Sequence, residues 1–380
     1  MDLNLTEDQR LIVDMVRDFA TNELAPTAAH RDETGEFPLP IFHQMAELGL
    51  LGMNVPEKYG GSATGAIAYA LSMMEIAKAD ASVAVTMSVT NMVAEIVSKF
   101  GTEQQCEQFV PRICHGEFPV GAFALTESAA GSDAGSLKMR AVRDGDDYVI
   151  DGSKLFITSG AYASVVVVMA RSLDNPGPKG ISAFLVPKDN PGMTVGKEEE
   201  KMGIRGSNTA ELIFEDCRVP SANMLGKPGE GFKVAMTALD SGRIGISCQA
   251  YGIGKAALDY SKEYAKERLQ FGRPISEFQA IQWKLADMAT QLEAARLLTM
   301  QAAWMKDRQM PHTVQASMAK VFSTEAANHV VREAVQIHGG YGYIKEYPVE
   351  RLFRDCKVNT LYEGTSEVQR IVISRNILQD

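Results

Sequence analysis

The chain has 380 residues, 45% hydrophobic and 23% charged, which is typical of a globular protein long enough for two or three domains. Its formal net charge of −10 argues against nucleic acid or an anionic membrane as the main partner, so an anionic ligand would need a local basic pocket. Five scattered cysteines without metal-ligand spacing indicate reduced thiols in a cytoplasmic protein, and we expect neither a signal peptide nor a membrane span.

Residues 1–120 are predicted to form an all-helical N-terminal domain. Thr6 and Gln9 form a capping box ahead of apolar residues that recur at helical spacing, and Pro26 is expected to end this first helix or begin a turn. Further helices are predicted at about 38–48, 67–79, 83–100 and 102–114. The small-residue run 77–91 is interpreted as a packed core helix, with the wall of a slot for a thin ligand as the alternative.

Residues 121–228 are predicted to form a middle β domain. Glycines become frequent, and β-type runs occur at 147–150, 154–158, 165–170, 181–186, 193–195 and 211–214. Turns such as Asp151-Gly152 separate these runs. Short strands at this spacing predict a small barrel or sandwich, and the lack of alternating helices argues against a parallel βαβ domain.

Two stretches of the β domain are candidate ligand sites. Residues 123–135 supply hydroxyls and open backbone amides, which suit a cofactor with carbonyls or phosphates, although a plain Gly/Ser loop explains them equally well. Phe156 and Thr158 share one face of a strand and can sit against a flat heterocycle, with a half-buried strand as the alternative. No Gly-x-Gly-x-x-Gly follows a predicted strand, so a Rossmann dinucleotide site is not indicated.

Residues 229–380 are predicted to form a C-terminal four-helix bundle. Apolar residues from Ile281 to Met305 step by threes and fours, which is typical of a bundle seam, and a further helix is predicted over 311–338. The bundle has no Glu-x-x-His pair, so a carboxylate-bridged di-iron site is not supported.

The last candidate is Glu363, which precedes a predicted helix over about 367–378. Thr365 or Ser366 can cap this helix, and Gly364 lets another molecule approach the backbone. Apolar surroundings would raise the pKa of the Glu363 carboxyl toward the value of a general base. The alternative is an acid that complements the helix dipole.

The chain resembles the acyl-CoA dehydrogenases over essentially its whole length, most of all their short-chain, butyryl-CoA-type members. The resemblance is carried by an ordered set of motifs: Thr126-Glu127 with Gly131-Ser132-Asp133, Phe156-Ile157-Thr158, Leu239-Asp240-Ser241-Gly242-Arg243, Arg268 to Gly272, Gln279, Gln336 to Gly342, and Tyr362-Glu363-Gly364-Thr365. It implies the three-domain α+β fold described above, a homotetramer, and an FAD bound without a Rossmann motif.

The resemblance also implies residue roles. Glu363 matches the catalytic base, and its backbone amide would help to hold the thioester oxygen. Substrate contacts are implied for Ser132, Asp240, Arg243 and Gly364. FAD contacts, some of them from a neighbouring subunit, are implied for Phe123, Leu125, Thr126, Gly131, Ser132, Phe156, Ile157, Thr158, Arg268, Phe271, Gln279, Gln336, Gly339, Gly340, Thr365 and Glu367.

Two positions bear on these roles. Ser128-Ala129 replaces the family's usual Pro-Gly, and we expect a looser loop near the flavin. Some long-chain and isovaleryl members take the base from a Glu just before the arginine that matches Arg243. This chain has Gly242 there, which leaves Glu363 as the candidate base.

The implied reaction is the α,β-dehydrogenation of a short-chain acyl-CoA to the trans-2-enoyl-CoA, with electrons passed to an electron-transferring flavoprotein. The same chain could run in reverse as an enoyl-CoA reductase, or act on a branched, cyclic or aromatic-derived acyl-CoA. A non-catalytic FAD-binding scaffold is the alternative from another class, and the presence of Glu363 argues against it.

Overall fold

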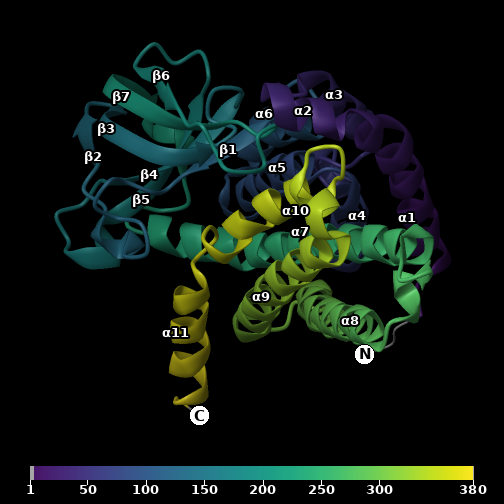
Figure 1. The fold of residues 1–380 in the computed structure, drawn as a ribbon. Helices are drawn as coiled ribbons and strands as arrows, with labels where there is room; N and C mark the ends of the chain where they lie inside the picture. Colours follow the sequence, from purple (N-terminus) through teal and green to yellow (C-terminus); the bar gives the residue numbers. More distant parts are fainter. Residues whose placement is uncertain (1–3, 380) are drawn as a thin grey trace.

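The computed structural model describes residues 4–379, and its first part is helical (Figure 1). Its longer helices are α1 (Glu7–Phe19), α2 (Ala28–Thr34), α3 (Leu39–Glu47), α4 (Gly65–Ala79), α5 (Ala81–Phe100) and α6 (Glu103–Cys114). The Thr6 side chain accepts a hydrogen bond from the Gln9 amide and closes the predicted capping box. Pro26 does not end the first helix but begins a turn, the second of its two predicted roles. α1 ends at Phe19, and Pro26 stands at the start of a short 3-10 turn, where proline is tolerated.

Helix α5 is the buried centre of this part. Of the described helices, it alone is long and apolar enough to span a membrane by length and composition, and 89% of the window concerned is buried inside the protein. Its N-cap Asp80 accepts from the Ser82 and Val83 amides and forms a buried ion pair with Arg31. Packing against other elements accounts for the apolar composition of α5.

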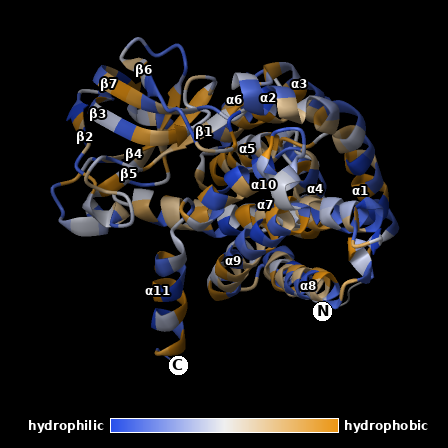
Figure 2. Cartoon of the chain, viewed as in Figure 1, coloured by the Kyte–Doolittle hydropathy of each residue, from blue (hydrophilic) through white to orange (hydrophobic). Residues whose placement is uncertain are grey.

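The middle part is one eight-stranded mixed sheet. Its strands are β1 (Gly121–Ala124), β2 (Arg140–Asp144), β3 (Asp147–Thr158), β4 (Val165–Arg171), β5 (Ile181–Pro187), β6 (Met193–Glu198), β7 (Thr209–Pro220) and β8 (Met224–Leu225). The order is β6-β7-β3-β2-β4-β5-β8, and β1 pairs with β4 in parallel. Figure 2 shows apolar segments among polar ones in these strands, and the buried apolar side chains of the sheet form a core.

The observed sheet differs from the sequence prediction at one turn and in strands that the sequence did not indicate. The predicted turn at Asp151-Gly152 does not interrupt the strand, because β3 continues through a register shift there. Strands β1 and β2 were not expected. β1 has only four residues, three of them small, and β2 buries Ala141 alone, so neither carries a clear strand pattern.

The last part is again helical: α7 (Gly231–Glu267), α8 (Gln279–Asp307), α9 (Thr313–His338), α10 (Val349–Lys357) and α11 (Ser366–Ile377). A short hairpin of β9 (Leu269–Gln270) and β10 (Arg273–Pro274) separates α7 from α8. Helix α7 begins under the sheet and runs through the helical body, where it contacts α4, α5, α8 and α9 (Figure 1). Helix α11 contacts α9 and projects from the body (Figure 1).

Candidate active site

Glu363 lies in a tight turn between α10 and α11. Its φ of 54° is in the left-handed region, and Gly364 follows with a φ of 86°. A non-glycine residue in this region costs of order 1–3 kcal/mol and needs support from its surroundings. The Thr365 side chain accepts from the Val368 amide at 3.3 Å, so Thr365, of the two predicted caps, starts α11.

Glu363 is half-buried, and one oxygen of its carboxyl is enclosed by protein. Its Oε2 is inaccessible to solvent and, within residues 4–379, has no hydrogen-bond partner. Burial raises the pKa of Glu363 to about 7, against the opposing effect of the Arg243 and Lys320 charges. A carboxyl with a pKa near neutrality can take up a proton at physiological pH, which is the property of a general base.

Helix α7 forms one wall beside this carboxyl. A Cβ atom at Gly242 would collide with the Glu363 carboxylate, so glycine leaves the room that the base occupies. A carboxylate placed at position 242 would reach the same space. The two base positions considered from the sequence therefore converge on one place.

Arg243 and Asp240 form a polar network next to Gly242. Arg243 is buried, and its Nη1 donates to Asp240 Oδ1 at 2.7 Å and to Ser317 Oγ at 3.3 Å. Asp240 also accepts from the Thr313 hydroxyl at 2.6 Å. The structure thus brings Asp240, Arg243, Glu363 and Gly364 into one region. Ser132, the other predicted substrate residue, is exposed on a loop of the β domain.

The predicted flavin-ring residues lie at the end of β3. A register shift between Lys154 and Ile157 re-aims the side chains, and Phe156 adopts a φ of 57° with 64% of its surface exposed. Ile157 is buried and Thr158 is half-buried, so Phe156 and Thr158 share the outer side of the strand as predicted. A bulge that turns an aromatic side chain outward leaves a flat apolar surface open to a ligand.

A buried clamp behind this strand was not predicted from the sequence. Lys154 is fully buried, and its Nζ donates to the Leu125 carbonyl at 3.0 Å and to Glu127 at 2.8 Å. Glu127 also accepts from the Lys138 and Met139 amides. The clamp fixes the segment of Phe123, Leu125 and Thr126 beside β3. The sequence signal that could have indicated this clamp is a lysine, Lys154, at an inward-facing position of a predicted strand.

Ser128 and Ala129 occupy a closed turn after Glu127. Glu127 and Ala130 exchange two backbone hydrogen bonds of 3.1 Å and close a tight turn. Gly131 follows with open space where a Cβ would stand. The backbone pair closes this turn without proline, and the expectation of a looser loop stays a prediction.

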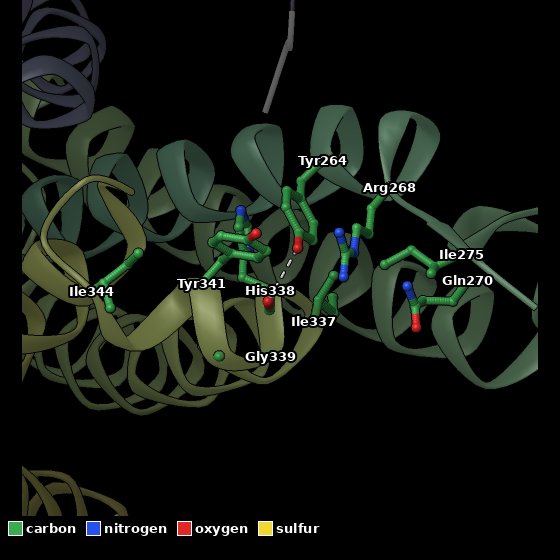
Figure 3. Close-up of a pocket in the computed structure, with 10 residues that line it drawn as sticks. Tyr264, Arg268, Gln270, Ile275, Ile337, His338, Gly339, Tyr341 and Ile344 are labelled. Atoms are coloured by element: carbon green, nitrogen blue, oxygen red, sulfur yellow. Dashed lines mark hydrogen bonds between the residues drawn. The ribbon is translucent and has the colours of Figure 1, made fainter.

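Besides the residues around Glu363 and those at the end of β3, a third group of predicted site residues surrounds a hollow of about 460 Å³ at the far end of α7 (Figure 3). The Arg268 guanidinium lies 5.3 Å from the Tyr341 ring centre, and Tyr264 donates to the His338 carbonyl at 3.2 Å. Gly339 and Gly340 have open space at their Cβ positions. Tyr264 and Gln270 also line the hollow and were missed from the sequence. Phe271, Gln279 and Gln336 lie nearby in sequence and are exposed.

This hollow is far from Glu363 within one chain. Twenty-six residues separate Gly242 from Arg268 along α7, which corresponds to about 39 Å of helix. The remaining predicted cofactor residues, Thr365 and Glu367, lie with Glu363. The hollow at Arg268 and the Glu363 turn are therefore separate regions of the chain, too far apart for one ligand molecule to contact both in the same copy.

The chemistry of these groups fits FAD. The outward Phe156 ring with the Thr158 hydroxyl suits a flat heterocycle, and the Arg268 cation beside open glycine amides suits a pyrophosphate. No group of three or more His, Cys, Asp or Glu side chains suited to a metal ion occurs among the described residues.

Comparison with known proteins gives matches along the whole chain. The acyl-CoA dehydrogenase family models match in order: the N-terminal domain at residues 6–117, the middle domain at 122–217 and the C-terminal domain at 229–378. The short-chain specific acyl-CoA dehydrogenase of Bos taurus is 49% identical, over 99% of this chain and 92% of that protein.

Two solved structures are also similar over the full length of both chains. Butyryl-CoA dehydrogenase from Megasphaera elsdenii is 45% identical with a TM-score of 0.97. A structure described as the electron-transferring flavoprotein of Acidaminococcus fermentans contains a chain that is 48% identical with a TM-score of 0.98.

Proposed function

Because the chain belongs to the acyl-CoA dehydrogenase family, we propose that it converts a short-chain saturated acyl-CoA to the trans-2-enoyl-CoA, with Glu363 as the base. The observation that carries this proposal is the Glu363 carboxyl, whose enclosed Oε2 has no hydrogen-bond partner among the described residues and whose pKa is raised to about 7 by burial. Similarity to the bovine short-chain enzyme and to butyryl-CoA dehydrogenase supports a substrate near four carbons in length.

Glu363 takes the α-proton of the thioester. The proton moves to the carboxylate while negative charge develops on the thioester oxygen, so a donor at that oxygen lowers the barrier. Within residues 4–379 the Glu363 backbone N–H donates no hydrogen bond, which leaves it open to this oxygen. Burial excludes water from the carboxylate and keeps it basic.

FAD, when bound, supplies the acceptor for the β-hydride. Phe156, Thr158 and Thr126 would hold its ring, and the Gly131 backbone would lie beside it. Arg268, Gly339 and Gly340 would hold the pyrophosphate and adenosine of a cofactor whose ring lies in a neighbouring copy, since the two regions of one chain are far apart. Similarity to a structure described as an electron-transferring flavoprotein supports such a protein as the electron acceptor.

Glu363→Gln tests the assignment of the base. The variant keeps the shape of the side chain but cannot take a proton, so we expect the rate of flavin reduction by butyryl-CoA in a single turnover to fall about 10²- to 10⁴-fold. Substrate binding should persist. Glu117→Gln is the matched control, because Glu117 is an exposed carboxylate paired with Arg112. Near-normal reduction in Glu363→Gln would show that another group removes the proton.

A panel of acyl-CoA thioesters on the wild-type protein tests the substrate. Butyryl-CoA should reduce the flavin fastest among straight chains, and faster than branched or cyclic thioesters. Fastest reduction by a branched thioester would instead support the alternative substrate class. No reduction by any thioester would support a scaffold without turnover.

A further inference from the structure

Lys320 of α9 is a fully buried lysine beside the Glu363 turn, with a relative exposure of 0%. Its neighbours on the buried side of α9 are small residues such as Ala316, Ala319 and Ser323. Lysine is almost never fully buried unless a partner compensates its charge. Its Nζ donates to the Gly364 carbonyl at 2.8 Å, so the lysine is directed at the segment that carries the base.

The carbonyl that Lys320 binds belongs to the strained turn. Glu363 and Gly364 both have positive φ, and such a conformation persists only where the surroundings fix it. Gln369, which is also fully buried, donates from Nε2 to the Glu363 carbonyl at 3.0 Å and to the Gly364 carbonyl at 2.9 Å. Two buried side chains therefore hold the two carbonyls of the turn, one with a charge and one without.

Lys320 also affects the base electrostatically. Burial lowers the pKa of Lys320 to about 8, and the Glu363 carboxylate opposes this shift. The other charged groups that act on Lys320 are Arg243 of α7, Glu367 of α11 and Glu325 of α9 itself. Arg243 and Lys320 are the two cations that favour the ionised form of Glu363. Arg243 is already bound to Asp240, whereas Lys320 has a neutral carbonyl as its partner.

We propose that Lys320 is a positioning residue for the base: it holds the Glu363–Gly364 turn through the Gly364 carbonyl, and its ammonium charge favours the carboxylate form of Glu363. The proposal rests on the proposed role of Glu363. Lys320 takes no part in bond making, and it acts only through the turn and the charge.

The test uses three variants of the FAD-loaded enzyme. Lys320→Met removes the donor and the charge, Lys320→Gln removes the charge and keeps a donor, and Gln369→Leu removes the neutral clamp alone. The limiting rate of flavin reduction by butyryl-CoA is measured against pH. Lys255→Met is the control, because Lys255 pairs with Asp259 on α7, away from the turn.

The acidic limb of the rate profile reports the ionisation of Glu363. Both Lys320 variants should raise the pKa of Glu363 and move this limb up by about one pH unit, because a nearby opposite charge changes a pKa by 1–3 units. Gln369→Leu should lower the plateau without moving the limb, since misplacement of a base by about 1 Å can cost up to 10²-fold. Infrared difference spectra against Glu363→Gln give a readout without turnover. The protonated carboxyl band of Glu363 should persist to higher pH in the Lys320 variants.

An unmoved limb and an unmoved carboxyl band in Lys320→Gln would overturn the proposal, even if Lys320→Met does not fold. Loss of rate with an unchanged limb in every variant would leave Lys320 a packing residue and overturn its role toward the base. These outcomes differ from failure of the proposed function, in which Glu363→Gln itself keeps its activity.

Discussion

At the scale of single residues, burial of the ionised Glu363 carboxylate lowers the free energy of unfolding. Burial raises its pKa to about 7 from an ordinary value of 4.5, so the folded protein holds a proton that the unfolded chain releases between these values. The folded state binds more protons there, and the free energy of unfolding therefore falls as pH rises from 4.5 to 7. A shift of this size corresponds to about 3 kcal/mol at pH above 7.

Glu363→Gln should therefore change the pH dependence of stability as well as the rate. Glutamine does not titrate, so the stability of the variant relative to wild type should rise by about 3 kcal/mol from pH 4.5 to pH 7. Thermal midpoints of both FAD-loaded proteins across this range measure the difference. If Glu363 were only a dipole-complementing acid, wild type would instead gain on the variant as pH rises, by up to about 1 kcal/mol.

At the residue scale, the sequence indicated Glu363 as the candidate base but indicated none of the side chains that support it. Glu363 stands in a motif, next to a cap and a glycine, and these are local signals. Lys320 lies on the α9 face that also buries Ala316 and Ser323, and its target Gly364 is 44 residues away. A buried partner across that separation depends on how α9 and α11 pack, which no local pattern specifies.

At the scale of elements, the end of β3 depends on the clamp of Lys154 and Glu127. Lys154 joins β3 to the segment after β1, and a bulge two residues later turns Phe156 outward. Burial lowers the pKa of Lys154 to about 8, and the bond to Glu127 opposes this shift. Removing one partner of a buried pair leaves the other charge uncompensated and is strongly destabilising.

Lys154→Met should weaken the retention of FAD, although Lys154 itself makes no contact with the cofactor in the proposed site. We expect a loss of about 3 kcal/mol in stability and faster release of FAD, because Thr126 and Phe156 lose their common support. Lys197→Met serves as the control, since Lys197 forms an exposed pair with Glu199. FAD release and thermal midpoint are measured in the same samples. Unchanged FAD release in Lys154→Met would show that the clamp does not support the flavin segment.

Elements with strong periodicity were predicted well and those without it were not. The helix predicted over 311–338 is α9, Thr313–His338, and the seam from Ile281 lies in α8. The strand that contains Asp151-Gly152 was divided in two, because a glycine that serves a bulge looks like a turn when only the sequence is read. β2 is mostly exposed, so its sequence lacks the alternation that marks a strand.

At the scale of the whole molecule, three parts of the chain meet around α10. Arg354 of α10 forms an ion pair with Asp32 of α2 at 2.6 Å and donates to the Met202 carbonyl in the loop before β7. Asp355 accepts from the Ile204 amide of the same loop, and burial raises the pKa of Asp355 to about 7. Contacts between such distant segments follow from tertiary packing, and none of them was predicted.

Exposed apolar side chains on the outer surface of the chain support the proposed FAD site between two copies. Helix α11 projects from the body (Figures 1 and 2). Ile377 and Leu378 at its end are exposed, and Phe271 is 94% exposed on the β9–β10 hairpin. Arg268, beside this hairpin, is about 39 Å of helix from Gly242 and the Glu363 site. A second copy that covers the hairpin would place Arg268 of the first copy beside the FAD whose ring the second copy binds. Binding of FAD and assembly should therefore be linked.

Arg268→Ala tests this link. Losing a charged hydrogen bond to the pyrophosphate costs about 1.5–3 kcal/mol, so FAD should bind about 10- to 100-fold more weakly. By mass action, the variant should also dissociate into smaller species on dilution, and added FAD should restore the assembly. Light scattering during gel filtration, with the flavin absorbance recorded in each peak, measures both quantities. Arg296→Ala is the control, because Arg296 pairs with Glu293 on α8. A stable monomer that keeps its FAD would contradict the two-chain site, whereas joint loss of FAD and assembly in Arg268→Ala alone would support it.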